Sequence, residues 1–270
     1  MFPVLVSLGP VHLYSFGTLF ILGLVCSWIL VRYLMYFYRL QPSKLYFALP
    51  GALVGGLVAA RLGFLLTYPE RFRSGLWIAL FSDHWWTEWA LWAGILGAAL
   101  ALIVYWIKHN EPVFLWLDVM SIALQPLMFF TSLGLLLSPV GLTSDALGRP
   151  TLLPWGVIVD AVDLPFANVP VHPLLLYGVV IAVITFLVTW LARVWARTYV
   201  GRLFVISTFL YGFLWWALGV VRWYSPRPFW GLDIFWLNAL IYMLIALSCM
   251  VYIIRKHAIT QRVKQAQGNL

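Results

Sequence analysis

An arginine inside an apolar run is the first residue of this sequence that could do chemistry. Arg61 lies within residues 51–68, GALVGGLVAARLGFLLTY, which are numerous enough to cross most of a bilayer. A guanidinium at that depth costs about 2.5–3.5 kcal/mol on insertion scales, so it needs a partner or a polar cavity. At about 1.5 Å per helical residue, Arg61 lies about 10 Å below Tyr68 and could reach a lipid phosphate. The alternative is an arginine that extends along its own stem to the interface.

Two further arginines stand near other polar groups. Asp145 and Arg149 are four residues apart, and the Gly-Arg-Pro segment around Arg149 predicts a turn. Arg222 ends an apolar run that also contains Tyr211. These groups could recognise a phosphate. The alternatives are a surface ion pair worth about 0–1 kcal/mol for Asp145 and Arg149, and an interfacial anchor for Arg222.

One histidine precedes an apolar run in a position where it could act on a substrate. His172 is followed by Pro173, a residue that suits the first turn of a helix, and Tyr177 comes five residues after it. An imidazole there could serve as a general acid or base. The alternative is a structural histidine, because no carboxylate is placed beside it by the sequence.

Metal and cofactor patterns are absent from the sequence. The five histidines are scattered, and Cys26 and Cys249 fall in apolar runs, where they are predicted to be small buried hydrophobic residues. No HExxH, CxxC or GxSxG motif occurs. His12 and His109 could ligate a macrocycle, but single histidines at span ends are weak evidence for that. We therefore expect no metal and no cofactor.

The composition predicts an all-α polytopic membrane protein. The chain has 270 residues, of which 63% are hydrophobic and only 10% charged. The apolar runs predict a single transmembrane domain over residues 1–270. Pro126, Gly134, Pro139 and Gly141 predict that the fourth of seven spans is broken. The spans are expected at 12–36, 46–68, 88–107, 113–141, 173–195, 203–222 and 233–254.

The distribution of basic residues predicts the orientation. Eleven of the seventeen Lys and Arg residues follow the odd-numbered spans, which puts the N-terminus outside and the C-terminus in the cytoplasm. Because topology explains these charges, the net charge of +8 does not indicate nucleic-acid binding. We expect an external interfacial segment at 69–87, a small external cap at 142–171 that is not helical, and a cytoplasmic basic tail at 256–270.

With these residues in view, the chain resembles the bacterial prolipoprotein diacylglyceryl transferases. Four stretches carry the resemblance, in the same order along most of the chain. They are SLGPVHLYSFGTLFILGL (7–24), AARLGFLLTYPERF (59–72), HPLLLYG (172–178), which is similar to a His-Pro-x-Gln-Leu-Tyr-Glu element, and LYGFLWWALGVVRW (210–223), which is similar to a Tyr-Gly-x-x-Arg-x-x-x-Glu-x-x-Arg helix.

The resemblance implies a multi-pass protein of the bacterial cytoplasmic (inner) membrane. It also implies transfer of the diacylglyceryl group of phosphatidylglycerol to the cysteine thiol of a secreted prolipoprotein. In such an enzyme arginines hold the lipid phosphate and polar residues assist loss of the thiol proton. The matching residues of this sequence are, for the phosphate, Arg61, Arg149, Arg222, Tyr177 and Tyr211, and for catalysis, Asp145 and His172.

Several polar positions of the family pattern are replaced here. Trp92 occupies the position of the histidine of a His-Gly-Gly element. Trp215 and Gly219 occupy the positions of the Arg and Glu of the fourth stretch. Leu175 and Gly178 replace the Gln and Glu of the third. A Gly-Arg-x-Gly-Asn-Phe-x-Asn signature is expected within residues 131–145, but no basic residue lies between His109 and Arg149 and no Asn between Asn110 and Asn168.

Three hypotheses follow. The first is a diverged member that binds phospholipid or serves as an accessory subunit of a membrane complex without transferring diacylglycerol, since each lost donor typically costs about 10²–10³ in rate. The second is an active transferase with a rearranged set of residues that includes Arg61, Asp145, Arg149, His172 and Arg222. The third is a cofactor-holding subunit, which the absorption spectrum of the pure protein would reveal.

Overall fold

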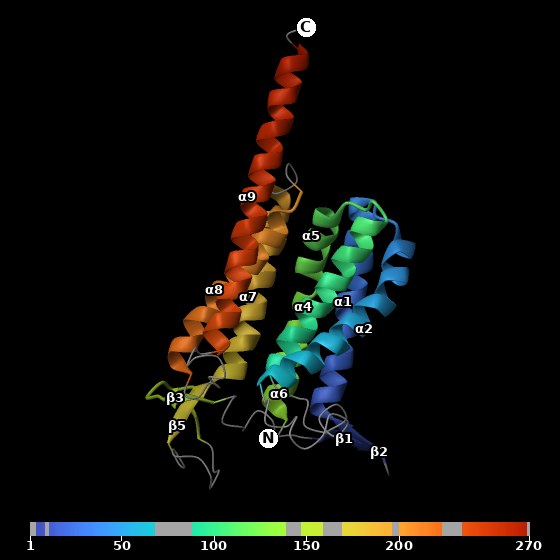
Figure 1. Ribbon diagram of the computed structural model, residues 1–270. Coiled ribbons are helices and arrows are strands. Elements are labelled where there is room, and N and C mark those ends of the chain that lie inside the picture. The colour runs from blue at the N-terminus through green and yellow to red at the C-terminus, as the bar shows by residue number, and fades with distance from the viewer. Residues whose placement is uncertain are drawn as a thin grey trace. The chain divides into compact units, whose positions relative to one another are not determined.

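Helices make up most of the described chain, and two small sheets each lead directly into a helix (Figure 1). The computed structural model describes residues 4–8, 11–67, 88–138, 147–158, 169–195, 200–222 and 234–268. The helices are α1 (Ser15–Tyr38), α2 (Pro42–Thr67), α4 (Glu88–Lys108), α5 (Val113–Ala123), α6 (Gln125–Leu137), α7 (Leu174–Trp195), α8 (Arg202–Leu218) and α9 (Ile234–Gly268).

These helices confirm the predicted polytopic helical fold. Within the described residues, six helical segments are long and apolar enough to span a membrane, and α4 coincides with the third of the seven predicted spans. The orientation of the termini stays a prediction. The interfacial segment 69–87 lies outside the described residues, whereas the backbone of the predicted tail is helical as far as Gly268.

The first and fourth spans differ in detail from the prediction. A hairpin of β1 (Val4–Leu8) and β2 (Val11–Tyr14) precedes α1, so the first helix begins at Ser15 and not at residue 12. The fourth span is interrupted only at Leu124, which keeps helical φ and ψ of −80° and −11°. Pro126 explains this interruption because it has no N–H to donate. The helix then continues to Leu137, so the predicted break is confined to the residues before Pro126, while Pro139 and Gly141 lie outside the described residues.

A side chain of α1 satisfies the backbone beside the interruption. The Ser27 hydroxyl accepts a hydrogen bond of 3.1 Å from the backbone N–H of Leu127. Early N–H groups of a helix lack partners within the helix, so such a contact fixes α6 against α1. Gly23 allows the close approach, since a Cβ atom there would lie 3.0 Å from the Cβ of Phe130.

The chain divides into two compact units. The larger unit comprises Met1–Leu34, Leu117–Ser225 and Phe235–Leu270, and the smaller unit comprises Met35–Trp116 and Pro226–Ile234. The single transmembrane domain over residues 1–270 stays a prediction.

In the smaller unit, α2 and α4 pack backbone against backbone, as the small residues of 51–68 predict. Gly97 is the tightest point of this contact. A Cβ atom at Gly97 would lie 2.5 Å from the carbonyl oxygen of Gly55 and would overlap the Cβ of Ala59. One turn earlier, a Cβ atom at Gly94 would lie 3.2 Å from the Cβ of Ala60. The predicted helix-packing stripe therefore has α4 as its partner.

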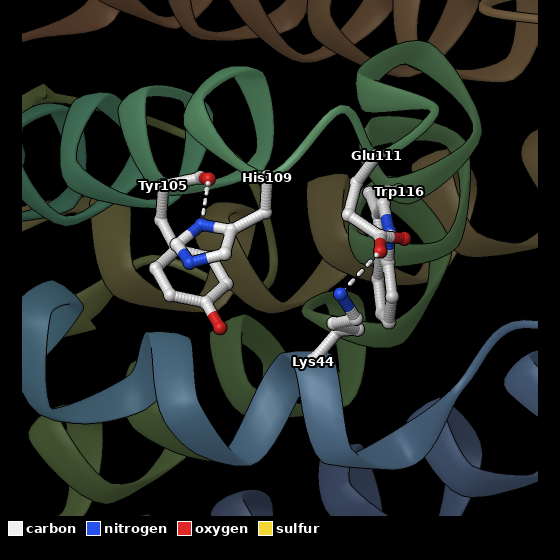
Figure 2. A network of polar contacts seen from close by, with 5 residues as sticks. All are labelled: Lys44, Tyr105, His109, Glu111 and Trp116. Atoms are coloured by element: carbon white, nitrogen blue, oxygen red, sulfur yellow. Dashed lines mark hydrogen bonds and ion pairs between the residues drawn. The ribbon is translucent and has the colours of Figure 1, made fainter.

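Polar contacts fasten the end of α4 in the same unit (Figure 2). The Lys44 ammonium lies 3.2 Å from a carboxylate oxygen of Glu111, and Trp116 Nε1 lies 3.4 Å from the other oxygen. His109 Nδ1 donates to the carbonyl of Tyr105 at 2.8 Å, and the two rings stack with centroids 4.1 Å apart. A donor on one of the last carbonyls of a helix stabilises its C-terminus, so these contacts give His109 a structural role.

In the larger unit, a buried carboxylate fixes the start of α8. Asp118 of α5 accepts hydrogen bonds from the backbone N–H of Gly201 at 2.6 Å and of Phe204 at 2.8 Å. Gly201 has a φ of 95°, which an L-residue with a side chain rarely adopts. Asp118 thus supplies partners for N–H groups that the first turn of the helix cannot pair.

We expect Asp118→Asn to lower the free energy of unfolding by about 1–3 kcal/mol, because an amide leaves one of these N–H groups facing another donor. Thermal unfolding of the purified protein in detergent measures the loss. Glu111→Gln is the matched control, since its ion pair with Lys44 is partly open to solvent and such surface pairs contribute only about 0–1 kcal/mol. Equal effects of the two substitutions would contradict this role of Asp118.

Candidate functional site

A three-stranded sheet in the larger unit positions most of the predicted polar residues. Its strands are β3 (Leu147–Pro150), β4 (Val157–Ile158) and β5 (Pro170–Pro173), ordered β3-β5-β4 with antiparallel pairing. β5 continues directly into α7 (Figure 1). The prolines stand at strand ends, where their missing N–H costs little. The described parts of 142–171 are therefore not helical, as predicted.

One local prediction for this region was wrong, because the Gly-Arg-Pro segment around Arg149 is part of strand β3 and not a turn. His172 precedes the helix, as predicted, but it lies in strand β5, and the helix begins at Leu174, after Pro173. Pairing with a strand more than twenty residues away decides both conformations, and local turn preferences do not report such pairing.

Gly148 is the point where three chain segments meet. It forms an antiparallel bridge with Arg222, and β3 also pairs with β5. A Cβ atom at Gly148 would lie 2.6 Å from the Cβ of His172 and 2.7 Å from the carbonyl oxygen of Val221. The absence of a side chain at Gly148 therefore lets the segments that carry Arg149, His172 and Arg222 lie side by side.

We expect Gly148→Ala to push these segments apart, because the backbone oxygen of Val221 cannot move like the end of a flexible side chain. Overpacking of this kind costs about 1–3 kcal/mol of stability. Thermal unfolding in detergent measures it, with Gly17→Ala as control because nothing lies within 4 Å of a Cβ atom at Gly17. A Gly148→Ala protein as stable as the control would contradict the described packing.

Two guanidinium groups belong to this meeting point. α8 gives way to a 3-10 turn at Gly219–Val221, after which Arg222 is extended with φ −74° and ψ 141°. Arg222 is 6% exposed, whereas Arg149 is exposed. Arg149 Nε donates to the carbonyl of Arg222 at 3.3 Å, which engages one of its five N–H donors. Among the described residues, its terminal nitrogens have no further partner.

His172 belongs to a short chain of hydrogen bonds. Its Nδ1 lies 2.7 Å from the hydroxyl of Tyr177, and the same hydroxyl lies 2.9 Å from Nε1 of Trp155. Partial burial of the imidazole lowers the pKa of His172 below its ordinary value, because leaving water disfavours the charged ring. The neutral ring is therefore the form present at neutral pH.

Four of the predicted site residues are thus brought together, namely Arg149, His172, Tyr177 and Arg222. Tyr211 lies in α8 of the same unit, with its hydroxyl 3.9 Å from the sulfur of Met128. Tyr211 and Tyr177 both pack against the buried side chains Leu174, Ile181 and Leu218.

The remaining two predicted residues are Arg61 and Asp145. Arg61 belongs to the smaller unit, where its guanidinium carbon lies 5.3 Å from the ring centroid of Phe64, a cation–π distance. Asp145 lies outside the described residues. The roles predicted for Arg61 and Asp145 stay predictions.

Tryptophans face two glycines that stand where the resembled family has Glu. A Cβ atom at Gly178 would lie 3.6 Å from Cη2 of Trp215 and 3.1 Å from the hydroxyl of Ser132. A Cβ atom at Gly219 would overlap the indole of Trp236. Large and small residues are therefore complementary at both positions.

Trp155 is the residue of this site that the sequence did not indicate. It lies in the connection between β3 and β4, 22 residues before Tyr177. No spacing or motif in the sequence could have identified its hydrogen bond to Tyr177, because only the sheet brings the two together.

Comparison with known proteins places this site in a family. The sequence profile of the prolipoprotein diacylglyceryl transferases matches residues 3–254. The chain is 28% identical over 231 residues to the phosphatidylglycerol–prolipoprotein diacylglyceryl transferase of Wolbachia sp. subsp. Drosophila simulans (strain wRi), covering 78% of both chains. It is 26% identical over 190 residues to the enzyme of that name from Legionella pneumophila (strain Paris), covering 65% of both.

The profile spans nearly the whole chain and all of its described spanning helices up to residue 254. The match, together with six apolar helices, supports the multi-pass location in the bacterial inner membrane that the resemblance implied. The chain belongs to the prolipoprotein diacylglyceryl transferase family.

Proposed function

We propose that this protein binds phosphatidylglycerol and transfers its diacylglyceryl group to the cysteine thiol of a prolipoprotein. The observation that carries the proposal is the gathering of Arg149, His172, Tyr177 and Arg222, which come from three segments far apart in the sequence. Relatives that cover 78% of this chain carry this activity in their names. Two guanidinium groups and an imidazole beside them suit a phosphate diester.

The reaction forms one bond and breaks one. The cysteine sulfur, after losing its proton, attacks the glycerol carbon of the diacylglyceryl group, and a thioether forms. The bond between that carbon and the phosphate oxygen breaks, and its electron pair leaves with glycerol phosphate. Arg149 and Arg222 would stabilise the negative charge that grows on this leaving group. Asp145, the other predicted catalytic residue, would accept the thiol proton.

A second candidate is a member that binds phospholipid without transfer, acting as an accessory subunit of a membrane complex. The observation that favours it is the packing of Trp215 and Trp236 against Gly178 and Gly219. Indole rings at these places supply no charge for a transition state, and a side chain at Gly219 would have to displace Trp236.

A single assay distinguishes the two candidate functions. The purified protein is incubated with phosphatidylglycerol and a peptide that contains a lipobox cysteine, and mass spectrometry follows the peptide. We expect a thioether-linked diacylglyceryl adduct that is absent from a peptide with serine in place of cysteine. Binding of phosphatidylglycerol without adduct would instead support the second candidate, and neither binding nor adduct would contradict both.

A further inference from the structure

The hydrogen-bond chain from Trp155 through Tyr177 to His172 has a defined direction. An indole N–H can only donate, so the Tyr177 oxygen accepts from Trp155 Nε1 at 2.9 Å. The hydroxyl proton of Tyr177 then needs an acceptor of its own. In the part of the chain that the structure describes, Tyr177 has one other polar contact, with His172 Nδ1 at 2.7 Å.

This direction selects one tautomer of the histidine. If Tyr177 donates to Nδ1, then Nδ1 carries a lone pair and the proton of a neutral imidazole is on Nε2. The Nε2–H group has no partner among the described residues. It is therefore available to an outside acceptor.

The surroundings indicate which acceptor fits. β5, which carries His172, pairs with β3, which carries Arg149, and Gly148 of β3 pairs with Arg222. Among the described residues, the charges that these neighbouring segments carry are both positive. An anionic oxygen is the acceptor that suits a neutral N–H donor on a strand whose neighbouring segments carry two arginines.

We infer that Trp155 and Tyr177 are positioning residues that hold His172 as a neutral hydrogen-bond donor, through Nε2, to a phosphate oxygen of a bound anionic lipid. The identity of that lipid rests on the proposed function. A general base at Nε2 would need a lone pair there and a proton on Nδ1, which is the opposite tautomer. The inference therefore removes His172 from the predicted role in thiol deprotonation and gives it a place in phosphate binding.

The tautomer can be observed directly. Nitrogen-15 spectra of histidine-labelled protein at neutral pH report the protonation of each ring nitrogen. The signals of His172 are assigned because they disappear in His172→Gln. They should show an unprotonated Nδ1 and a protonated Nε2. In Tyr177→Phe the neutral form of His172 loses a hydrogen-bond donor, so the pKa of His172 should rise relative to wild type. Tyr36→Phe, whose ring is 86% exposed, should leave that pKa unchanged. A wild-type proton on Nδ1 would overturn the inference.

Two substitutions of His172 distinguish a role as hydrogen-bond donor from a role as general base. Glutamine keeps an N–H donor of similar reach but cannot take up a proton, whereas alanine keeps neither. We expect His172→Ala to weaken phosphatidylglycerol binding by about 10- to 100-fold, the usual range for a hydrogen bond to a charged group, and His172→Gln by no more than about threefold. The loss of phosphatidylglycerol binding in Trp155→Phe should lie between the losses in the two His172 variants. Trp28→Phe in α1 is the matched control.

Suppose that His172→Gln and His172→Ala both unfold at the wild-type temperature and lose affinity for phosphatidylglycerol equally. That result would overturn the donor role. Failure of the proposed function has a different signature. If the wild-type protein binds no phosphatidylglycerol, the binding comparison contains no signal, and the nitrogen spectra alone decide whether Trp155 and Tyr177 hold the stated tautomer.

Discussion

Replacing Arg222 with alanine is expected to lower the rate of diacylglyceryl transfer by about 10²–10³-fold. The guanidinium is buried at the end of α8, where burial strengthens its attraction for a phosphate that gains charge as it leaves. Its backbone also bridges to Gly148 and accepts from Arg149, so its position is well defined. The adduct assay with saturating phosphatidylglycerol measures the rate.

Two variants make this result specific. Arg222→Lys keeps the charge but not the planar fork of donors, so its rate should fall between those of wild type and alanine. Arg255→Ala removes an exposed arginine in α9 and should retain the wild-type rate. Unfolding temperatures show whether each variant is folded. A folded Arg222→Ala protein with the wild-type rate would exclude Arg222 from the transfer site.

Replacing Gly97 with leucine is expected to destroy the packing of α2 on α4, at a cost above the roughly 1–3 kcal/mol typical of overpacked cores. The obstacle is backbone, since even a Cβ atom would lie 2.5 Å from the carbonyl oxygen of Gly55. Helices that contact through small residues cannot separate without losing most of their mutual dispersion contacts. The yield of monodisperse protein in mild detergent and its unfolding temperature measure the effect.

Gly51→Leu in α2 is the matched control, because nothing lies within 4 Å of a Cβ atom there. It introduces the same side chain at an exposed position and should leave yield and unfolding temperature near those of wild type. If both leucine variants behave alike, the close contact between α2 and α4 is not what stabilises the smaller unit.

The spanning helices were predictable because their signal is local. Apolar runs of membrane-spanning length coincide with the described helices to within a few residues at most ends, and the small residues around Gly55 predicted close packing without naming the partner. Pro126 and Gly134 were among the residues that predicted a broken fourth span, and the break is confined to Leu124. The N–H of Leu127 finds the Ser27 hydroxyl of another helix, a compensation that the sequence does not display.

The candidate site was predictable as a set of residues but not as an arrangement. Arg149, His172, Tyr177 and Arg222 could each be named from residue type and from the resemblance. Their proximity depends on strand pairing across more than twenty residues and on the space at Gly148. For the same reason, the sequence shows that Trp215 replaces an arginine of the family pattern, but it does not show that the indole packs beside Gly178.

The central claim is that Arg149 and Arg222 help to form a site for a lipid phosphate, and lipid retention tests it most directly. Native mass spectrometry would compare retention of phosphatidylglycerol with that of diacylglycerol, which has no phosphate, in wild type and in the Arg149→Ala/Arg222→Ala double variant. We predict that wild type retains phosphatidylglycerol preferentially and that the folded double variant loses this preference. An unchanged preference in the double variant would contradict the claim.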